Sequence, residues 1–529
     1  MKNKFRLTSI LRFLLYAHLS LSTSFAISAD KPLKAPEPAS VTWLQQDLKL
    51  NGIGVGVEWA HKNVFFSLGN GFDKPVDYYM TFNYKYADAG YQFAINGIPV
   101  SNGSLFRFKR VKYGAKIPIQ RSRNGVVEAY TLIFTNLPVL QLNAAKIVDE
   151  PKSLGSFRLM SQRFKQDTGV LKMGVEFRGA GTQSYIKKSL GVQIGKATDW
   201  TKASDIKLLD LNKDNDWMLN AVYVDTSFFR DLVSYDIFRA IRPGAYIDAH
   251  GVARGQASLR GHLIEVIKNG IYDGVYSLNE KPSRKMYDLQ KITVPLDTKG
   301  LPQWRTVKFS VPENGSVFYK AAAFEDVFYD SASVKANFDQ VYPKPKDVVR
   351  WNPLVEFANF VATSTDQKFT ADIAKKIDLD SVVDWWALVL ASHGEDNIKH
   401  NFSLAKSGSG KFYLLAWDHE GSFGINWFAF EPDTNNLIKR LTKLPATHFN
   451  TKLKARWKAL RLTELSQGKM VARFQQYLNE SNKGGARARN TARWPERGEE
   501  NMGTAKYINA YLAQWLPQAD KLIAGLPEK

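Results

Sequence analysis

The sequence contains no cysteine, and this absence removes several classes of chemistry at once. Disulfide bonds, zinc–thiolate centres and cysteine nucleophiles are all excluded. No apolar run beyond the first segment is long enough to cross a bilayer, so we do not expect an integral membrane protein. What remains is a chain of 529 residues, 44% hydrophobic and 13% aromatic, which is a globular composition with ample core for two or three domains.

The N-terminal segment has the layout of an export signal. A positively charged start precedes an apolar stretch over residues 13–21, and small residues follow at 26–29. This order predicts a cleaved signal peptide over residues 1–29, followed by a linker rich in Pro and Ala over 30–40. The protein is therefore expected to be secreted or periplasmic, and export without disulfides suggests a bacterial source.

Charge is strongly one-sided, with a formal net charge of +21. In an exported protein, such a balance favours acidic substrates or an anionic cell-envelope surface as partners, rather than nucleic acid. The alternative is a solvated basic surface without a specific partner.

Residues 41–135 have the pattern of a small all-β, sandwich-like accessory module. Met80, Phe82 and Tyr84 alternate with polar residues, which is the periodicity of a strand. Five Asn-Gly pairs supply turn residues that tolerate the positive φ angles of tight hairpins. These pairs begin at Asn51, Asn70, Asn96, Asn102 and Asn124. Exposed aromatic side chains in such a module bind sugars in some proteins, but more often they belong to the core.

From residue 136 onward the pattern becomes mixed α and β. It predicts strands over 171–177 and 190–194, a helix over 225–241, hairpins over 262–278 and 401–417, and a buried helix over 381–392 that is N-capped by Asp380 and ended by Gly394. Residues 431–529 read as a basic, mostly helical C-terminal extension of the domain over 136–430. The expected fold class is therefore α+β.

The stretch over 380–424 carries the most specific chemistry. Asp396 follows the buried helix, Asn401 comes five residues later, and Asp418 follows the next hairpin. Protein kinases present a proton-accepting Asp and a metal-binding Asn and Asp in this order, with the same spacing between the first two. Upstream, the loop over 178–189 offers Arg178, glycines and the pair Lys187 and Lys188 as candidate phosphate ligands.

Five blocks of sequence, in this order, resemble the CotH kinase family (spore coat protein H-like). They are RGAGTQSYIKKS (178–189), WMLNAVYVDTSFFRDLVSYDIFRAI (217–241), NGIYDGVYSLNEK (269–281), VFYKA (317–321) and DNIKHNFSLAKSGSGKFYLLAWDHEGSFG (396–424). The resemblance implies a bilobal, atypical protein-kinase-like domain. It also implies ATP and Mg²⁺ or Mn²⁺ as cofactors, and Ser or Thr of extracytoplasmic proteins as phosphate acceptors.

The resemblance also implies roles for individual residues. Asp396 matches the catalytic Asp, and the metal ligands are Asn401 and Asp418, with Glu420 as a third candidate. Lys187 matches the phosphate-binding lysine, with Lys188 as second choice, and the remaining nucleotide-site residues are Arg178 and Glu280. Two departures stand out: the family's Trp-Asp-x-Asp is Trp-Asp-His-Glu over 417–420, and the loop after Arg178 lacks the family's Ser-rich sequence. The acidic partner of the lysine is left open between Asp231 and Asp236.

The sequence allows two other interpretations of the function. The fold can be retained without turnover, as a pseudokinase that acts in surface binding or in envelope or coat assembly. The second is a metal hydrolase, with His393, Asp396, His400, Asp418 and His419 as ligands, although their spacing matches no known metal motif.

Overall fold

The computed structural model describes residues 48–528, with gaps at 85–89, 293–297, 299–314, 324, 346–347 and 497–499. The predicted signal peptide and linker, residues 1–29 and 30–40, lie outside the described residues. Within them, no helix combines the length and hydropathy needed to cross a membrane.

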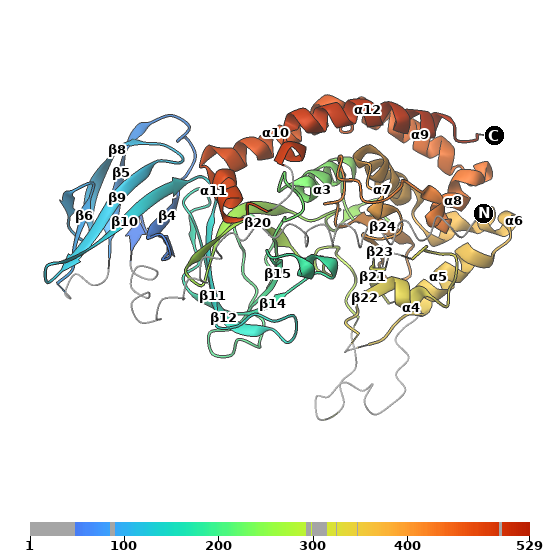
Figure 1. The fold of residues 1–529 in the computed structure, drawn as a ribbon. Coiled ribbons are helices and arrows are strands. Elements are labelled where there is room, and N and C mark those ends of the chain that lie inside the picture. Colours follow the sequence, from blue (N-terminus) through green and yellow to red (C-terminus); the bar gives the residue numbers. More distant parts are fainter. Residues whose placement is uncertain are drawn as a thin grey trace, which may run out of the picture. The chain divides into compact units, whose positions relative to one another are not determined.

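Residues 49–135 form two sheets that share one hydrophobic core (Figure 1). The first sheet has the order β2 (Ile53–Gly54), β1 (Lys49–Leu50), β5 (Val76–Asn83) and β8 (Ser104–Val111). The second has the order β3 (Gly56–Glu58), β4 (Asn63–Ser67), β10 (Val126–Thr135), β9 (Lys116–Arg123), β6 (Gln92–Ile95) and β7 (Ile98–Val100). The alternating residues Met80 and Phe82 point into this shared core, as their periodicity predicts.

A closed barrel of seven strands follows, and the sequence did not predict it. Its strands are β11 (Val139–Ala144), β19 (Gly261–Lys268), β20 (Ile271–Glu280), β16 (Asp216–Asn220), β15 (Leu190–Ile194), β14 (Leu171–Phe177) and β12 (Ser153–Ser161). β11 closes the ring because it pairs with β12 in antiparallel and with β19 in parallel register. The short strand β13 (Gln166–Asp167) extends the sheet from β12.

The C-terminal half combines a second sheet with helices. The sheet has the order β22 (Phe338–Tyr342), β21 (Val317–Ala321), β23 (Phe402–Lys406) and β24 (Phe412–Ala416). The helices are α3 (Arg230–Ile241), α4 (Val334–Asn337), α5 (Asn352–Thr363), α6 (Asp366–Lys376), α7 (Leu379–Ser392), α8 (Asn436–Lys443), α9 (Phe449–Arg461), α10 (Gln467–Lys483), α11 (Ala486–Arg493) and α12 (Ala505–Ala524). α10 and α12 run side by side and contact α3 and α7 (Figure 1). A two-stranded ribbon, β17 (Tyr246–Ile247) with β18 (Ala253–Arg254), follows α3.

The observed elements confirm the α+β class, and two helix boundaries correct the predicted ones. The helix predicted over 225–241 begins only at Arg230, because Asp225 forms a turn in which its side chain accepts the Ser227 N–H at 2.9 Å. α7 is capped by Asp378 rather than Asp380, and it ends at His393 in the left-handed region rather than at Gly394. The bilobal kinase-like arrangement stays a prediction.

Candidate active site

The end of α7 presents the first candidate residue, Asp396. α7 is buried along almost its whole length, which fixes its position between the sheet and the C-terminal helices. After the helix, a short 3₁₀ turn over Asp396–Ile398 holds the buried Asp396 side chain. Asn401 Nδ2 donates to Asp396 Oδ2 at 2.7 Å. The other carboxylate oxygen, Oδ1, is buried and lies 3.4 Å from Nδ1 of His400.

The buried side-chain amide of Asn397 joins the segment at Asn401 to the segment at Asp418. Asn397 Nδ2 lies 2.9 Å from the carbonyl oxygen of Asn401 and 3.0 Å from those of Trp417 and Asp418. Asn401 and Asp418 both have positive φ, 52° and 53°, a strained conformation that this network holds in place. The structure therefore brings the predicted residues Asp396, Asn401 and Asp418 together.

Helix α3 supplies two further contacts to the turn that carries Asp418. The Asp418 N–H donates to the Tyr235 hydroxyl at 3.0 Å, and the His419 N–H donates to Asp231 Oδ1 at 2.5 Å. Of the two acidic candidates on α3, Asp231 thus belongs to this site. Asp236 instead pairs with Arg239 and accepts from the Tyr477 hydroxyl at 2.8 Å.

The site concentrates negative charge. Burial raises the pKa of Glu420 well above its ordinary value, and the charges of Asp418 and Asp231 raise it further. Burial also raises the pKa of Asp231, and Asp418 adds to the shift. Carboxyl groups that repel one another in this way are stabilised by a cation between them. Glu420 therefore lies with the other predicted metal ligands, as its place in the sequence predicts.

No three His, Asp or Glu side chains in the described ranges are gathered tightly enough to hold a metal ion by themselves. Mg²⁺ seldom uses an all-protein cage and is more often bound by one or two carboxylates together with substrate phosphates. The donor set fits that mode, because Asn401 donates through Nδ2 and keeps its Oδ1 for a cation. Asp418 and Glu420 are both partly exposed and would supply the carboxylates.

The loop that begins at Arg178 lies against the same cluster. Arg178 Nη1 donates to Asn220 Oδ1, and its charge lowers the pKa of Asp231. At the end of the loop, burial raises the pKa of Tyr185, and Glu420 raises it further. Arg178 is thus close to the acidic cluster, as the prediction requires.

The two lysines of the loop make contacts of a different kind. Lys187 is buried, and its ammonium group donates to the Val275 carbonyl at 2.5 Å and to Asn490 Oδ1 at 3.0 Å. It also lies 4.3 Å from the centre of the Tyr276 ring. Lys188 donates to the carbonyl of Gln183 within its own loop. Both ammonium groups therefore have protein acceptors, and the phosphate-binding role of either one stays a prediction.

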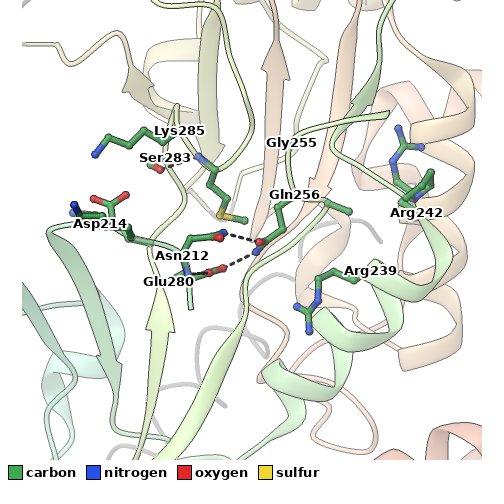
Figure 2. A pocket seen from close by; sticks show the side chains of 14 residues that line it. Asn212, Asp214, Arg239, Arg242, Gly255, Gln256, Glu280, Ser283 and Lys285 are labelled. Atoms are coloured by element: carbon green, nitrogen blue, oxygen red, sulfur yellow. Dashed lines mark hydrogen bonds between the residues drawn. The ribbon is translucent and has the colours of Figure 1, made fainter. Parts of the chain in front are cut away.

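Glu280 is engaged at a different place, a polar pocket of about 710 Å³ (Figure 2). Its carboxylate accepts from the Asn212 N–H at 2.8 Å and from Gln256 Nε2 at 2.6 Å, and it pairs with Arg260 at 3.0 Å. These bonds tie the end of β20 to two neighbouring loops. These bonds account for the burial of Glu280 without a nucleotide. The predicted role of Glu280 near the nucleotide stays a prediction.

Lys320 is the cation near this cluster to which sequence reasoning gave no role. It lies on β21, and its Nζ is 4.9 Å from the centre of the Trp417 ring. Burial lowers its pKa, whereas the charges of Asp418 and Asp396 raise it. The only signal in the sequence was the block VFYKA (317–321), whose lysine had no assigned function.

The three histidines that the hydrolase interpretation requires are engaged in packing or in contacts with the protein. His393 stacks on the Trp515 ring with 3.4 Å between ring centres, and burial lowers its pKa to about 4. His419 is fully buried, and burial lowers its pKa to about 3. His400 Nε2 lies 2.9 Å from the Ala322 carbonyl. This part of the described structure offers a hydrolytic metal centre no support.

The buried carboxyl group of Glu395 is expected to make the stability of the fold depend on pH. Burial raises its pKa to about 7, and its Oε1 accepts the Trp427 N–H at 2.5 Å. Because the folded pKa exceeds the unfolded value near 4.5, the folded state loses stability as the pH rises between the two, by up to about 3 kcal/mol. We expect Glu395→Gln to remove most of this loss, measured by urea unfolding at pH 5 and pH 8. Glu496→Gln, at an exposed position, is the control; equal stability differences at both pH values would contradict the expectation.

Comparison with known proteins shows the family of the chain. The fold is α+β, and the buried Asp396 and Asn401 and the partly exposed Asp418 follow one another in the order that phosphotransferases of the kinase type use. The model of the family described as CotH kinase protein matches residues 175–516, more than half of the chain, and the chain belongs to this family. It is also similar to the Inner spore coat protein H of Bacillus subtilis (strain 168), with 22% identity over 261 residues. That match covers 48% of this chain and 59% of the relative's length.

Proposed function

We propose that this protein transfers the γ-phosphate of ATP to Ser or Thr hydroxyl groups of extracytoplasmic proteins, in a reaction that requires Mg²⁺ or Mn²⁺. The observation that carries the proposal is the hydrogen-bond network in which Asn397 joins Asn401 to Asp418 and Asn401 in turn donates to Asp396. Membership of the CotH kinase family supports the same reaction. The predicted export signal is the reason for an extracytoplasmic acceptor.

In this proposal Asp396 acts as the base. Asn401 holds Asp396 Oδ2, and the second oxygen, Oδ1, which lies 3.4 Å from His400 Nδ1, would accept the proton of the acceptor hydroxyl as the new O–P bond forms and ADP leaves. Asn401 and Asp418 hold the metal, with Glu420 as a further ligand. A bound Mg²⁺ or Mn²⁺ supplies charge neutralisation of the nucleotide phosphates.

A second candidate function is assembly without turnover. The name of the relative, Inner spore coat protein H, favours a structural role at a surface layer. Glu420, where the family has Asp, favours it as well, because the longer side chain changes the reach of a metal ligand.

The test compares the chain without residues 1–29 with its Asp418→Ala variant. Both are incubated with γ-labelled ATP, Mn²⁺ and casein, after their thermal stabilities have been matched. We expect label in casein with the parent protein alone. No label with either protein, together with no metal-dependent thermal shift on addition of ATP, contradicts the kinase function and leaves the assembly role.

A further inference from the structure

Lys320 has a position that no structural role accounts for. It lies on β21 between two paired strands, opposite Ser403 on β23 and Asp339 on β22. Its side chain is only partly buried. Within the described residues, its ammonium group forms no ion pair within 4.0 Å and no hydrogen bond, apart from its approach to the Trp417 ring. A lysine carries three donors, so this one retains its full capacity to bind an anion.

Three of the four charged groups that act on Lys320 belong to the candidate active site, and the fourth is Asp339, its partner on β22. Asp418 has the strongest electrostatic effect on Lys320, and Asp396 acts in the same direction. Arg178, whose charge also acts on Asp231, is the second cation at this place. The Trp417 ring, one residue before Asp418, holds the ammonium group by a cation–π contact. Two cations, Lys320 and Arg178, therefore lie near the carboxylates of the candidate active site.

Lys187 differs from Lys320 in each of these respects. It is 2% exposed, and the two acceptors of its ammonium group come from the barrel strand β20 and from α11. Asn490 Oδ1 accepts from the Val275 N–H as well, so this contact is part of the packing of α11 on the barrel. Binding a phosphate would require Lys187 to give up these buried hydrogen bonds, which disfavours that role.

We propose that Lys320 binds the phosphates of the nucleotide and thereby has the role expected of the lysine in the 178–189 loop. The inference rests on the proposed function, because it assumes that a nucleotide occupies the site. It assigns Lys187 instead to the joint between the barrel and α11. The phosphate-binding cation thus comes from the C-terminal sheet. The same sheet contains β23 and β24, which lie between Asn401 and Asp418 in the sequence.

The test is the equilibrium binding of ATP and of adenosine, each with Mn²⁺, measured by calorimetry. We expect Lys320→Met to weaken ATP binding by about ten- to a hundredfold, as for loss of one charge-assisted hydrogen bond, and to leave adenosine binding unchanged. Lys320→Arg should restore part of the affinity for ATP. Lys406→Met is the matched control, because Lys406 is a partly buried lysine of the same sheet whose ammonium group lies 5.8 Å from the centre of the Phe412 ring. Lys187→Met should lower the thermal unfolding midpoint while ATP binding to the folded protein persists.

The outcomes separate this inference from the proposed function. ATP binding that is equal in the parent protein and in Lys320→Met overturns the role of Lys320 alone. Loss of ATP and adenosine binding together in Lys320→Met also overturns it, because that result indicates a disturbed fold rather than a lost phosphate contact. No ATP binding by the parent protein overturns both. ATP binding that depends on Lys320, without transfer to casein, supports the inference and contradicts the kinase function.

Discussion

Replacement of Asp396 by Asn is expected to lower the turnover of phosphoryl transfer by about 10²–10⁴-fold, the usual contribution of a positioned general base. The substitution keeps the shape of the side chain and one oxygen to accept from Asn401 Nδ2. It removes the group that accepts the proton from the acceptor hydroxyl. Oδ1 accepts no hydrogen bond within the described structure, and the contact that the substitution changes is the one with His400 Nδ1 at 3.4 Å, which is why stability is measured as well.

The measurement is the initial rate of labelling of casein at saturating ATP, with thermal unfolding recorded in parallel. Asp380→Asn is the control, because Asp380 is an exposed residue near the start of the same helix and pairs only with Lys452 at 2.7 Å. Turnover of Asp396→Asn within threefold of the parent protein would show that Asp396 is not the base. An unchanged Km for ATP is expected, because Asp396 is not assigned to the nucleotide.

Local patterns predicted the local elements well. The strands expected over 171–177 and 190–194 have these same bounds in β14 and β15, since both are short apolar runs between turn signals. Asn96 and Asn124 have φ near 50° and are followed by glycines at φ near 80°, as the Asn-Gly hairpin signal requires. These features depend on residues adjacent in the chain, which a single sequence displays directly.

Closure of the barrel could not be predicted in this way. β11 (Val139–Ala144) pairs in parallel with β19 (Gly261–Lys268), more than a hundred residues away. The alternation in β11, where Leu140 and Leu142 face the barrel interior, indicates which side of the strand is buried but does not identify a partner strand so distant in the sequence. Its physical basis is the packing of the whole barrel interior, including Leu140, Val192 and Ile264.

The residues of the candidate site that are close in the sequence could also be predicted, whereas those that tertiary contacts bring in could not. Asp396, Asn401 and Asp418 lie within 23 positions of one another, so their spacing was visible in the sequence. Asp231 was one of two open choices, because both acidic residues fall on the same helix and only tertiary contacts separate them. Apart from the block VFYKA, nothing in the sequence indicated Lys320, because it is 76 positions before Asp396 and is brought to the site by the pairing of β21 with β23.

The largest effect on stability is expected from Arg230→Met. Arg230 and Asp225 are 0% and 1% exposed, and their side chains pair at 2.5 Å. Removal of one partner from a buried ion pair costs about 3–5 kcal/mol, because the remaining charge stays buried without compensation. Arg230 also donates to the Ser422 carbonyl at 2.9 Å and to the Met502 carbonyl at 2.6 Å, so these two acceptors lose their donor as well.

Urea unfolding of the parent protein and the variant measures this cost through the shift in midpoint. Lys368→Met is the control, because Lys368 is 63% exposed and its pairing with Asp372 should contribute less than about 1 kcal/mol. Arg230→Lys should fall between the two, since it keeps the charge but loses donors. A loss below 1 kcal/mol for Arg230→Met would mean that Asp225 is compensated from elsewhere. A loss of the expected size would show that this pair, through Ser422, holds the segment that follows Asp418 against α3.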